Sequence, residues 1–222
     1  MKGKIIVIDG MDGTGKETQS KLLYNRLREN NEKVELFSFP NYYEDSSYFV
    51  KKWLNEGYCR DIDNPILHNL FYAIDRCITY NKHIKEKYED GYIIILDRYV
   101  IANAIYTLNE FQNKTMYCKI ANEIEHIHLE LPKPDINIVL YSDPVVNTKL
   151  IEERCKSENV EADLNENLEF QTKIFNNIQY LNIESSSFFG KIETLLIHDI
   201  YGKINTREET ADQIMNIVKK YI

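Results

Sequence analysis

The amino-acid sequence predicts an α/β fold, and three observations support this prediction. Short apolar runs alternate along the chain with longer amphipathic stretches, which is the order expected when helices join the strands of a sheet. Several of these runs are apolar on consecutive residues, as in strands that are covered on both faces. A glycine-rich segment lies directly after the first apolar run. We therefore expect a five-stranded parallel sheet flanked by helices.

The predicted elements follow one another in alternating order. The strands, rich in Ile, Val, Leu and Phe, are expected at Lys4–Asp9, Lys33–Phe39, Tyr92–Asp97, Ile136–Tyr141 and Glu193–Ile200. The helical segments are expected at Thr18–Asn30, Asp45–Glu56, Ile66–Glu89, Val100–Phe111, Asn113–His128, Val145–Lys156, Asn165–Asn182 and Arg207–Tyr221. Strands separated by helices imply parallel pairing with right-handed crossovers.

The organisation of the chain indicates one domain. The sequence has 222 residues, without an internal repeat or a Pro/Gly/Ser-rich linker, so we expect a single domain over residues 1–222. The polar segment Ser157–Asn167 lies between two helical stretches. We expect it to belong to a short lid over residues 145–167.

Charge and cysteine usage exclude several classes of protein. The net charge of −8 disfavours a surface that binds nucleic acid or an anionic membrane, although a local positive pocket could still hold a small anion. The 4 cysteines form no C-x-x-C pair, which gives little support to a zinc site or a disulfide framework. No apolar run approaches the ~20 residues that span a bilayer. We expect a cytoplasmic protein without a nucleic-acid or membrane partner.

The segment after the first predicted strand carries the strongest motif. It has the form G-x-x-x-x-G-K between a strand and a helix, which is typical of a phosphate-binding loop. Its glycines let backbone N–H groups point into one concavity, and the following helix adds its positive dipole end. Its lysine adds a full charge for the β- and γ-phosphates. We expect ATP to bind through Gly10, Met11, Asp12, Gly13, Thr14, Gly15, Lys16, Glu17 and Thr18; a glycine-rich turn without a ligand is the alternative.

One position in this loop departs from the usual motif. Glu17 stands where the motif has Ser or Thr, whose hydroxyl binds Mg²⁺. Thr18 does not simply substitute, because neighbouring helix residues point about 100° apart. Either Mg²⁺ is held mainly by phosphate oxygens and water, or Glu17 contributes its carboxylate.

Four further motifs occur in order along the chain. They are Phe39-Pro40-Asn41-Tyr42, then Phe71-Tyr72-Ala73-Ile74-Asp75-Arg76, then Asp97-Arg98-Tyr99, and finally Asn103 with Tyr106. The glycine loop and two of these motifs lie at the carboxyl ends of predicted strands, where ligands of open parallel sheets bind. We therefore expect them to converge on one crevice.

With these motifs the sequence resembles the thymidylate kinases, which are P-loop nucleoside monophosphate kinases. The resemblance covers nearly the whole chain: D-G-x-G-K, F-P-x-Y, the aromatic-A-x-D-R helix, D-R-Y-x-x-x-N-x-x-Y, P-x-P-D and a polar lid. Each motif alone is weak, whereas their order and spacing are specific. The resemblance implies a P-loop kinase fold, ATP and Mg²⁺ as cofactors, and dTMP as the substrate.

The resemblance also implies roles for the charged residues. Lys16 would hold the ATP phosphates, and Arg98 would hold the monophosphate, for which a guanidinium offers bidentate bonds. Arg154 would close from the lid over the transferred group, since the glycine loop supplies no arginine. Asp97 would lie near Mg²⁺, directly or through water. The alternatives are an ion pair for Arg98, a helix cap for Asp97 and a solvated helix position for Arg154.

The remaining matched residues would form the nucleoside pocket. Tyr72 would stack on the thymine ring, Arg76 and Asn103 would hydrogen-bond the base, and Asp12 would receive the 3′-hydroxyl. The 2′ side of the sugar would be crowded by Tyr42 and Tyr106, with Phe39 in the same loop as Tyr42. Ala102 and Thr107 differ from the residues of many family members beside the base.

The sequence thus predicts an enzyme that phosphorylates dTMP to dTDP by in-line transfer from ATP. A kinase for dUMP or a 5-substituted pyrimidine nucleotide, and a P-loop ATPase or switch, are the alternatives. The family usually forms homodimers, for which the apolar faces of Ile66–Ile84 and Val100–Phe111 are candidates. A separate group of glutamates, Glu123, Glu125 and Glu130, is expected on a solvated acidic face.

Overall fold

The computed structural model describes residues 2–30, 32–158, 167–184 and 186–222. Its centre is a five-stranded parallel sheet in the order β2-β3-β1-β4-β5. The strands are β1 (Lys4–Gly10), β2 (Val34–Ser38), β3 (Ile93–Asp97), β4 (Ile136–Tyr141) and β5 (Ile192–Leu196). The predicted fold class is therefore confirmed.

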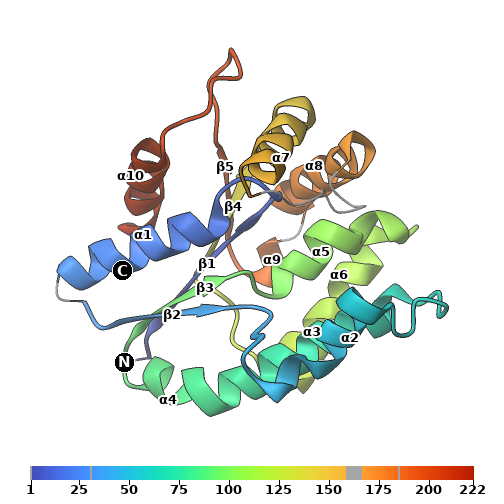
Figure 1. Ribbon diagram of the computed structural model, residues 1–222. Coiled ribbons are helices and arrows are strands. Elements are labelled where there is room, and N and C mark those ends of the chain that lie inside the picture. The colour runs from blue at the N-terminus through green and yellow to red at the C-terminus, as the bar shows by residue number, and fades with distance from the viewer. Residues whose placement is uncertain (1, 31, 159–166, 185) are drawn as a thin grey trace.

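Helices cover both faces of this sheet, as Figure 1 shows. The α-helices are α1 (Lys16–Glu29), α2 (Tyr48–Glu56), α3 (Pro65–Thr79), α4 (Lys85–Glu89), α5 (Val100–Thr107), α6 (Lys114–Asn122), α7 (Pro144–Glu158), α8 (Leu168–Glu184), α9 (Ser186–Phe189) and α10 (Arg207–Val218). Alternate residues of β1 point to opposite faces, so two apolar layers form. Ile6 and Ile8 pack with side chains of α1 and α10, whereas Ile5 and Val7 pack with side chains of α5 and α8.

The register of the central strands places polar residues at one edge of the sheet. Ile8 of β1 lies beside Asp97 of β3, and Gly10 lies beside Leu140 of β4. Because all strands are parallel, the loops after β1, β2 and β3 leave from this same edge. This is the convergence that the motifs predict.

The fifth strand is shorter than the prediction. It ends at Leu196 rather than Ile200, and His198 pairs in an antiparallel bridge with Ile204. The Asp199 carboxylate accepts the backbone N–H groups of Tyr201 and Lys203, which turns the chain back on itself. In Figure 1 this hairpin projects beyond the body of the molecule.

Two predicted helices contain π-helical segments. The long helix Ile66–Glu89 consists of α3, the π-helical segment Tyr80–Ile84 (η2) and α4, while α6 continues into the π-helical segment Glu123–His128 (η4). Short 3-10 segments lie at Asp45–Ser47 (η1) and Leu108–Glu110 (η3). Over the described part of the chain, no helix combines the length and the apolar character that crossing a membrane would require.

Candidate active site

The loop between β1 and α1 has the conformation that a phosphate cradle needs. Gly15 precedes α1 with φ 80°, a left-handed conformation that glycine adopts without strain. At Gly10, an added Cβ would lie 1.9 Å from the Leu140 carbonyl oxygen, so β1 can approach β4 here only with glycine. The Thr14 hydroxyl donates to the Met11 carbonyl at 2.7 Å and closes the loop. The predicted segment therefore forms one continuous concave turn at the start of a helix.

Lys16 lies inside this loop. Its Nζ donates to the Met11 carbonyl at 2.7 Å and lies 3.2 Å from Asp12 Oδ1, and the side chain is 7 % exposed. Burial and the nearby Arg98 guanidinium lower the pKa of the Lys16 ammonium, against the opposing pull of Asp12 and Asp9. A buried ammonium with loop carbonyl and carboxylate partners is a cation held ready for an anionic ligand.

Arg98 meets Lys16 at the same carboxylate. Its Nη2 donates to Asp12 Oδ1 at 2.9 Å, and its guanidinium lies 5.4 Å from the centre of the Tyr106 ring. Burial would raise the pKa of the Asp12 carboxyl, but Lys16 and Arg98 together hold it well below the ordinary value. Asp12 therefore stays ionised and joins the two cations that the sequence assigns to donor and acceptor phosphates.

The backbone of Arg98 is held in an unusual conformation. Its φ is 67°, in the left-handed region where a non-glycine residue is strained. Its N–H donates to the Ile8 carbonyl of β1 at 3.0 Å, which fixes the end of β3 against β1. This conformation turns the side chain toward the glycine loop.

Asp9 is a member of the site that the sequence analysis missed. Its two oxygens accept the N–H of Gly10 at 2.9 Å and that of Tyr99 at 3.3 Å, and the side chain is 0 % exposed. Burial raises the pKa of this carboxyl to about 6, although Arg98 and Lys16 oppose the shift. One carboxylate thus ties the glycine loop to the segment that carries Arg98. An aspartate ending an otherwise apolar strand was the available signal.

A second buried aspartate shapes the other side of the crevice. Asp75 of α3 accepts the Asn41 N–H at 2.8 Å and the Ser46 hydroxyl at 2.6 Å, which holds the loop after β2 against α3. Tyr42 in this loop is 49 % exposed, and Phe39 is buried with its ring 5.9 Å from that of Tyr99. The loop therefore leaves Tyr42 half exposed and is anchored through Phe39.

The predicted nucleoside pocket also includes the aromatic residues Tyr72 and Tyr106 and the amide of Asn103. Tyr72 is half-buried on α3, and burial, reinforced by Tyr42, raises its pKa to about 12. The Asn103 amide donates to the Asn69 carbonyl at 3.3 Å. The Tyr106 hydroxyl donates to the Gly10 carbonyl at 3.3 Å, which places this ring against the glycine loop.

Arg76 and Glu125 form a buried ion pair below this pocket. Arg76 Nε donates to Glu125 Oε2 at 3.0 Å, and Nη2 donates to Oε1 of the same carboxylate. The Glu125 side chain is 4 % exposed, so its expected place on a solvated acidic face is wrong. The physical reason is the π-helical segment η4, which directs this carboxylate inward toward a buried cation that needs a counter-charge.

The two candidate metal residues lie in different surroundings. Glu17 is 69 % exposed and pairs with Lys21 at 2.5 Å. Asp97 is half-buried, with Oδ2 3.5 Å from the Ser38 hydroxyl, and burial raises the pKa of its carboxyl. Over the described residues no three His, Cys, Asp or Glu side chains gather into a metal site. Either carboxylate nevertheless fits Mg²⁺ as a single protein ligand, because Mg²⁺ is usually held by one or two carboxylates together with substrate phosphates.

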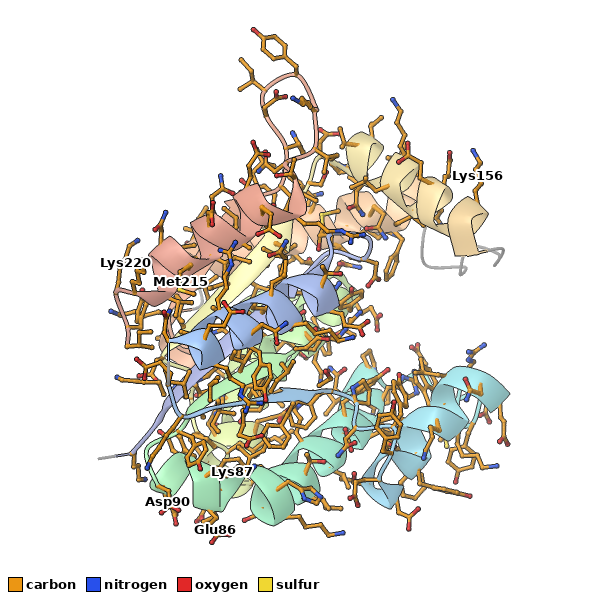
Figure 2. All side chains as sticks on the ribbon, turned by 60° about the vertical axis from the view of Figure 1, so that its left-hand side comes forward. Glu86, Lys87, Asp90, Lys156, Met215 and Lys220 are labelled. Carbon is orange, nitrogen blue, oxygen red and sulfur yellow. The ribbon has the colours of Figure 1, made fainter. Side chains whose placement is uncertain are left out.

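The segment that is expected to form a lid is described in part. Helix α7 reaches Glu158, but the Arg154 side chain and residues 159–166 lie outside the described residues. Lys156 is exposed and points away from the body of the molecule (Figure 2). Asn147, which the sequence analysis missed, ties α7 to the glycine loop because its amide donates to the Asp12 carbonyl at 2.9 Å. A buried asparagine in a helix gives no specific signal in the sequence.

A phosphate loop whose lysine meets the arginine of a second motif at one carboxylate is typical of a P-loop nucleoside monophosphate kinase, which is a phosphotransferase, and the comparisons assign the chain to this class. The family model "Thymidylate kinase" matches residues 8–192. The chain therefore belongs to the thymidylate kinase family.

Relatives agree with this assignment, and solved structures share the fold. The chain is 28 % identical to the thymidylate kinase of Caldicellulosiruptor saccharolyticus, over 92 % of this chain and 95 % of that one. It is 27 % identical to that of Schizosaccharomyces pombe, over 93 % and 95 %. The solved thymidylate kinase of Candida albicans aligns with a TM-score of 0.68 at 24 % identity, over 99 % of this chain and 92 % of that one. That of Ehrlichia chaffeensis aligns with the same score at 17 % identity, over 98 % and 100 %. At these identities the structural matches speak for the fold.

Proposed function

We propose that this protein transfers the γ-phosphoryl group of ATP to dTMP and releases ADP and dTDP. The observation that carries the proposal is the shared carboxylate: Lys16 Nζ lies 3.2 Å and Arg98 Nη2 2.9 Å from Asp12 Oδ1. Two cations of different motifs thus lie close enough to hold two phosphate groups side by side. A switch that binds one nucleotide has no need of the second cation or its aromatic pocket.

The chemistry requires positioning and charge neutralisation rather than a general base. The acceptor phosphate is already an anionic nucleophile, and the main barrier is the approach of two polyanions. Lys16 and the loop N–H groups hold the ATP phosphates, while Arg98 orients the acceptor phosphate for in-line attack. Asp12 aligns both cations before substrate arrives. Arg154 closes from the lid and adds charge, and the closed lid excludes water that would hydrolyse ATP.

Magnesium would add charge neutralisation between the β- and γ-phosphates when it is bound. Asp97 is the residue best placed to hold it, directly or through water, because it is half-buried at the end of β3 beside the cations. Glu17 is the weaker candidate, since its carboxylate is exposed and paired with Lys21.

The nucleoside would lie between the loop after β2 and helices α3 and α5. Tyr72 supplies a ring against which the base stacks, and Arg76 and Asn103 supply hydrogen-bond donors. Tyr42 and Tyr106 occupy the side of the sugar where a 2′-hydroxyl would need space. Burying that hydroxyl without a partner costs about 1–3 kcal/mol, so deoxynucleotides are preferred.

We also propose a cytoplasmic homodimer. Of the two candidate faces, residues Val100–Ile105 of α5 are buried in the core. The exposed apolar residues Ile74 of α3 and Met116 of α6 lie on neighbouring helices and are the better candidates for a dimer contact. Sedimentation analysis gives the mass directly.

A panel of acceptors tests the proposed substrate. The measurement is kcat/KM for dTMP, dUMP, dCMP, dGMP and UMP with ATP and Mg²⁺. We expect dTMP to give the highest value. A higher value for dUMP would assign the enzyme to the alternative nucleotide, and ATP turnover that is indifferent to every acceptor would contradict a kinase.

A further inference from the structure

The ion pair between Arg76 and Glu125 is among the most deeply buried charges of the molecule. The two side chains are 2 % and 4 % exposed, and the carboxylate accepts from both Nε and Nη2 of the guanidinium. Removing two charges from water is costly, and apolar residues of similar size often stabilise a protein equally well. Stability alone therefore gives little reason for this pair, which points to a role in the site.

The backbone around Glu125 is built to hold the carboxylate in place. Glu125 lies in η4, and its own carbonyl accepts the Leu131 N–H at 3.0 Å. The neighbouring His126 donates from Nδ1 to the Leu131 carbonyl at 2.8 Å, and the Leu129 N–H donates to the Ile124 carbonyl at 2.9 Å. π-Helical segments frequently occur at functional sites, where they redirect a side chain.

The pair lies beside residues that are expected to bind the nucleoside. Arg76 follows Tyr72 by one turn on α3, so the two side chains lie on the same face of this helix. Glu125, Asn103 and Ala73 line one small cavity between α3, α5 and α6. A base stacked on Tyr72, with its phosphate at Arg98, would therefore direct its far edge toward Arg76 and Asn103.

Glu125 decides which N–H groups of Arg76 remain for a ligand. A guanidinium has five N–H donors. Two are directed at Glu125, and Nη1 is 3.5 Å from the Tyr99 carbonyl. The N–H groups left on Nη1 and Nη2 can only donate, so they favour an exocyclic oxygen over an exocyclic amino group.

We propose that Glu125 is a positioning residue for base recognition: by fixing the Arg76 guanidinium, it makes the site select the oxo group that distinguishes thymine from cytosine. This role rests on the proposed function and deepens it. The reacting phosphates lie at Lys16 and Arg98, so Glu125 acts on the binding of the base rather than on the chemical step.

Glu125→Gln tests the role, with Glu123→Gln as the matched control, because Glu123 is exposed on the same segment. The glutamine places an N–H₂ group against the guanidinium and removes the charge that orients it. We expect KM for dTMP to rise and the dTMP/dCMP ratio of kcat/KM to fall, each by about tenfold or more, with kcat for dTMP within about threefold. Glu123→Gln should leave all three values unchanged.

An unchanged dTMP/dCMP ratio in folded Glu125→Gln would overturn the proposal, as would a loss of kcat without a change in that ratio. If Glu125→Gln does not fold, Glu125→Asp decides: it keeps the charge one methylene further away, and an unchanged ratio there overturns the proposal equally. A parent enzyme that does not prefer dTMP over dCMP contradicts the proposed function itself. The parent enzyme thus tests the proposed function, and the variants test the role of Glu125.

Discussion

At the scale of single residues, the site depends on cations held by carboxylates that are buried or partly buried. Asp12 accepts hydrogen bonds from Lys16 and Arg98, and Glu125 accepts them from Arg76. Asp9 accepts the backbone N–H groups of Gly10, in the glycine loop, and of Tyr99, which follows Arg98. Each carboxylate reduces the freedom of a group that would otherwise have to be ordered when substrate binds. Such preorganisation is what makes charges effective in a transition state.

Lys16→Ala tests the donor side of this arrangement. The charge stabilises the transferring phosphoryl group more than bound ATP, so we expect kcat to fall at least ~100-fold. Lys21→Ala is the control, because Lys21 is an exposed lysine five residues further along α1. A Lys16→Ala enzyme within about threefold of the parent, roughly 0.65 kcal/mol, would refute the loop assignment.

The raised pKa of Asp9 predicts a pH dependence of stability. Its folded pKa of about 6 lies above the ordinary value of 3.8, so folding retains a proton that the unfolded chain releases between these pH values. The resulting stabilisation is fully present below about pH 4 and is lost as pH rises through about 6. Relative to Asp9→Asn, the parent should lose ~1 kcal/mol of unfolding free energy between pH 5 and 7.

Denaturant unfolding of both proteins at each pH measures this difference. Groups common to the two proteins cancel, so the comparison isolates Asp9. A difference that stays constant from pH 5 to 7 would show that the Asp9 carboxyl is not the group that titrates.

The proximity of site residues could be predicted where a motif is local. Lys16, Arg98 and Asp12 could be found because the spacing of the glycine loop and the strand-end motif bring them together in any parallel sheet. The burial of Glu125 and Asp75 could not be predicted, because each carboxylate pairs with a residue that is distant in sequence. Composition predicts exposure for a carboxylate, and a tertiary contact overrides it.

At the scale of elements, strands were more predictable than the ends of helices. Four of the five strands lie within one residue of their predicted bounds at each end, because a sheet covered on both faces requires continuous apolar runs. The exception is β5, where apolar residues continue past Leu196 into a turn made by Asp199 and Gly202. The π-helical segments have no simple periodic signature and could not be foreseen.

The first turn of α1 gives a prediction about magnesium. Glu17 points to Lys21 in solvent, whereas Asp97 lies beside the cations of the site. We expect Glu17→Gln to leave the Mg²⁺ concentration for half-maximal activity unchanged and Asp97→Asn to raise it several-fold, because a hard cation prefers an anionic oxygen.

Activity measured over a Mg²⁺ titration at saturating ATP and dTMP gives both midpoints. A higher midpoint in Glu17→Gln with no change in Asp97→Asn would exchange the roles of the two carboxylates.

At the scale of the whole molecule, a chain of net charge −8 holds two cations, Lys16 and Arg98, together with the carboxylate that joins them, at one edge of its sheet. The loops after β1 and β3 bring Lys16 and Arg98 to this edge, and the loop after β2 is fastened to α3 by Asp75. The overall charge repels extended polyanions, whereas Lys16 and Arg98 can bind the phosphates of small ones. The architecture therefore suits two nucleotides that meet at their phosphates.

The most direct test of this account is the stoichiometry of the reaction. The purified protein is incubated with ATP and Mg²⁺, with and without dTMP, and ADP, dTDP and inorganic phosphate are quantified by chromatography. We predict one dTDP for each ADP, almost no inorganic phosphate, and ADP formation many-fold slower without dTMP. ADP formation at the same rate without dTMP, accompanied by equal inorganic phosphate, would contradict direct transfer between two adjacent phosphate sites.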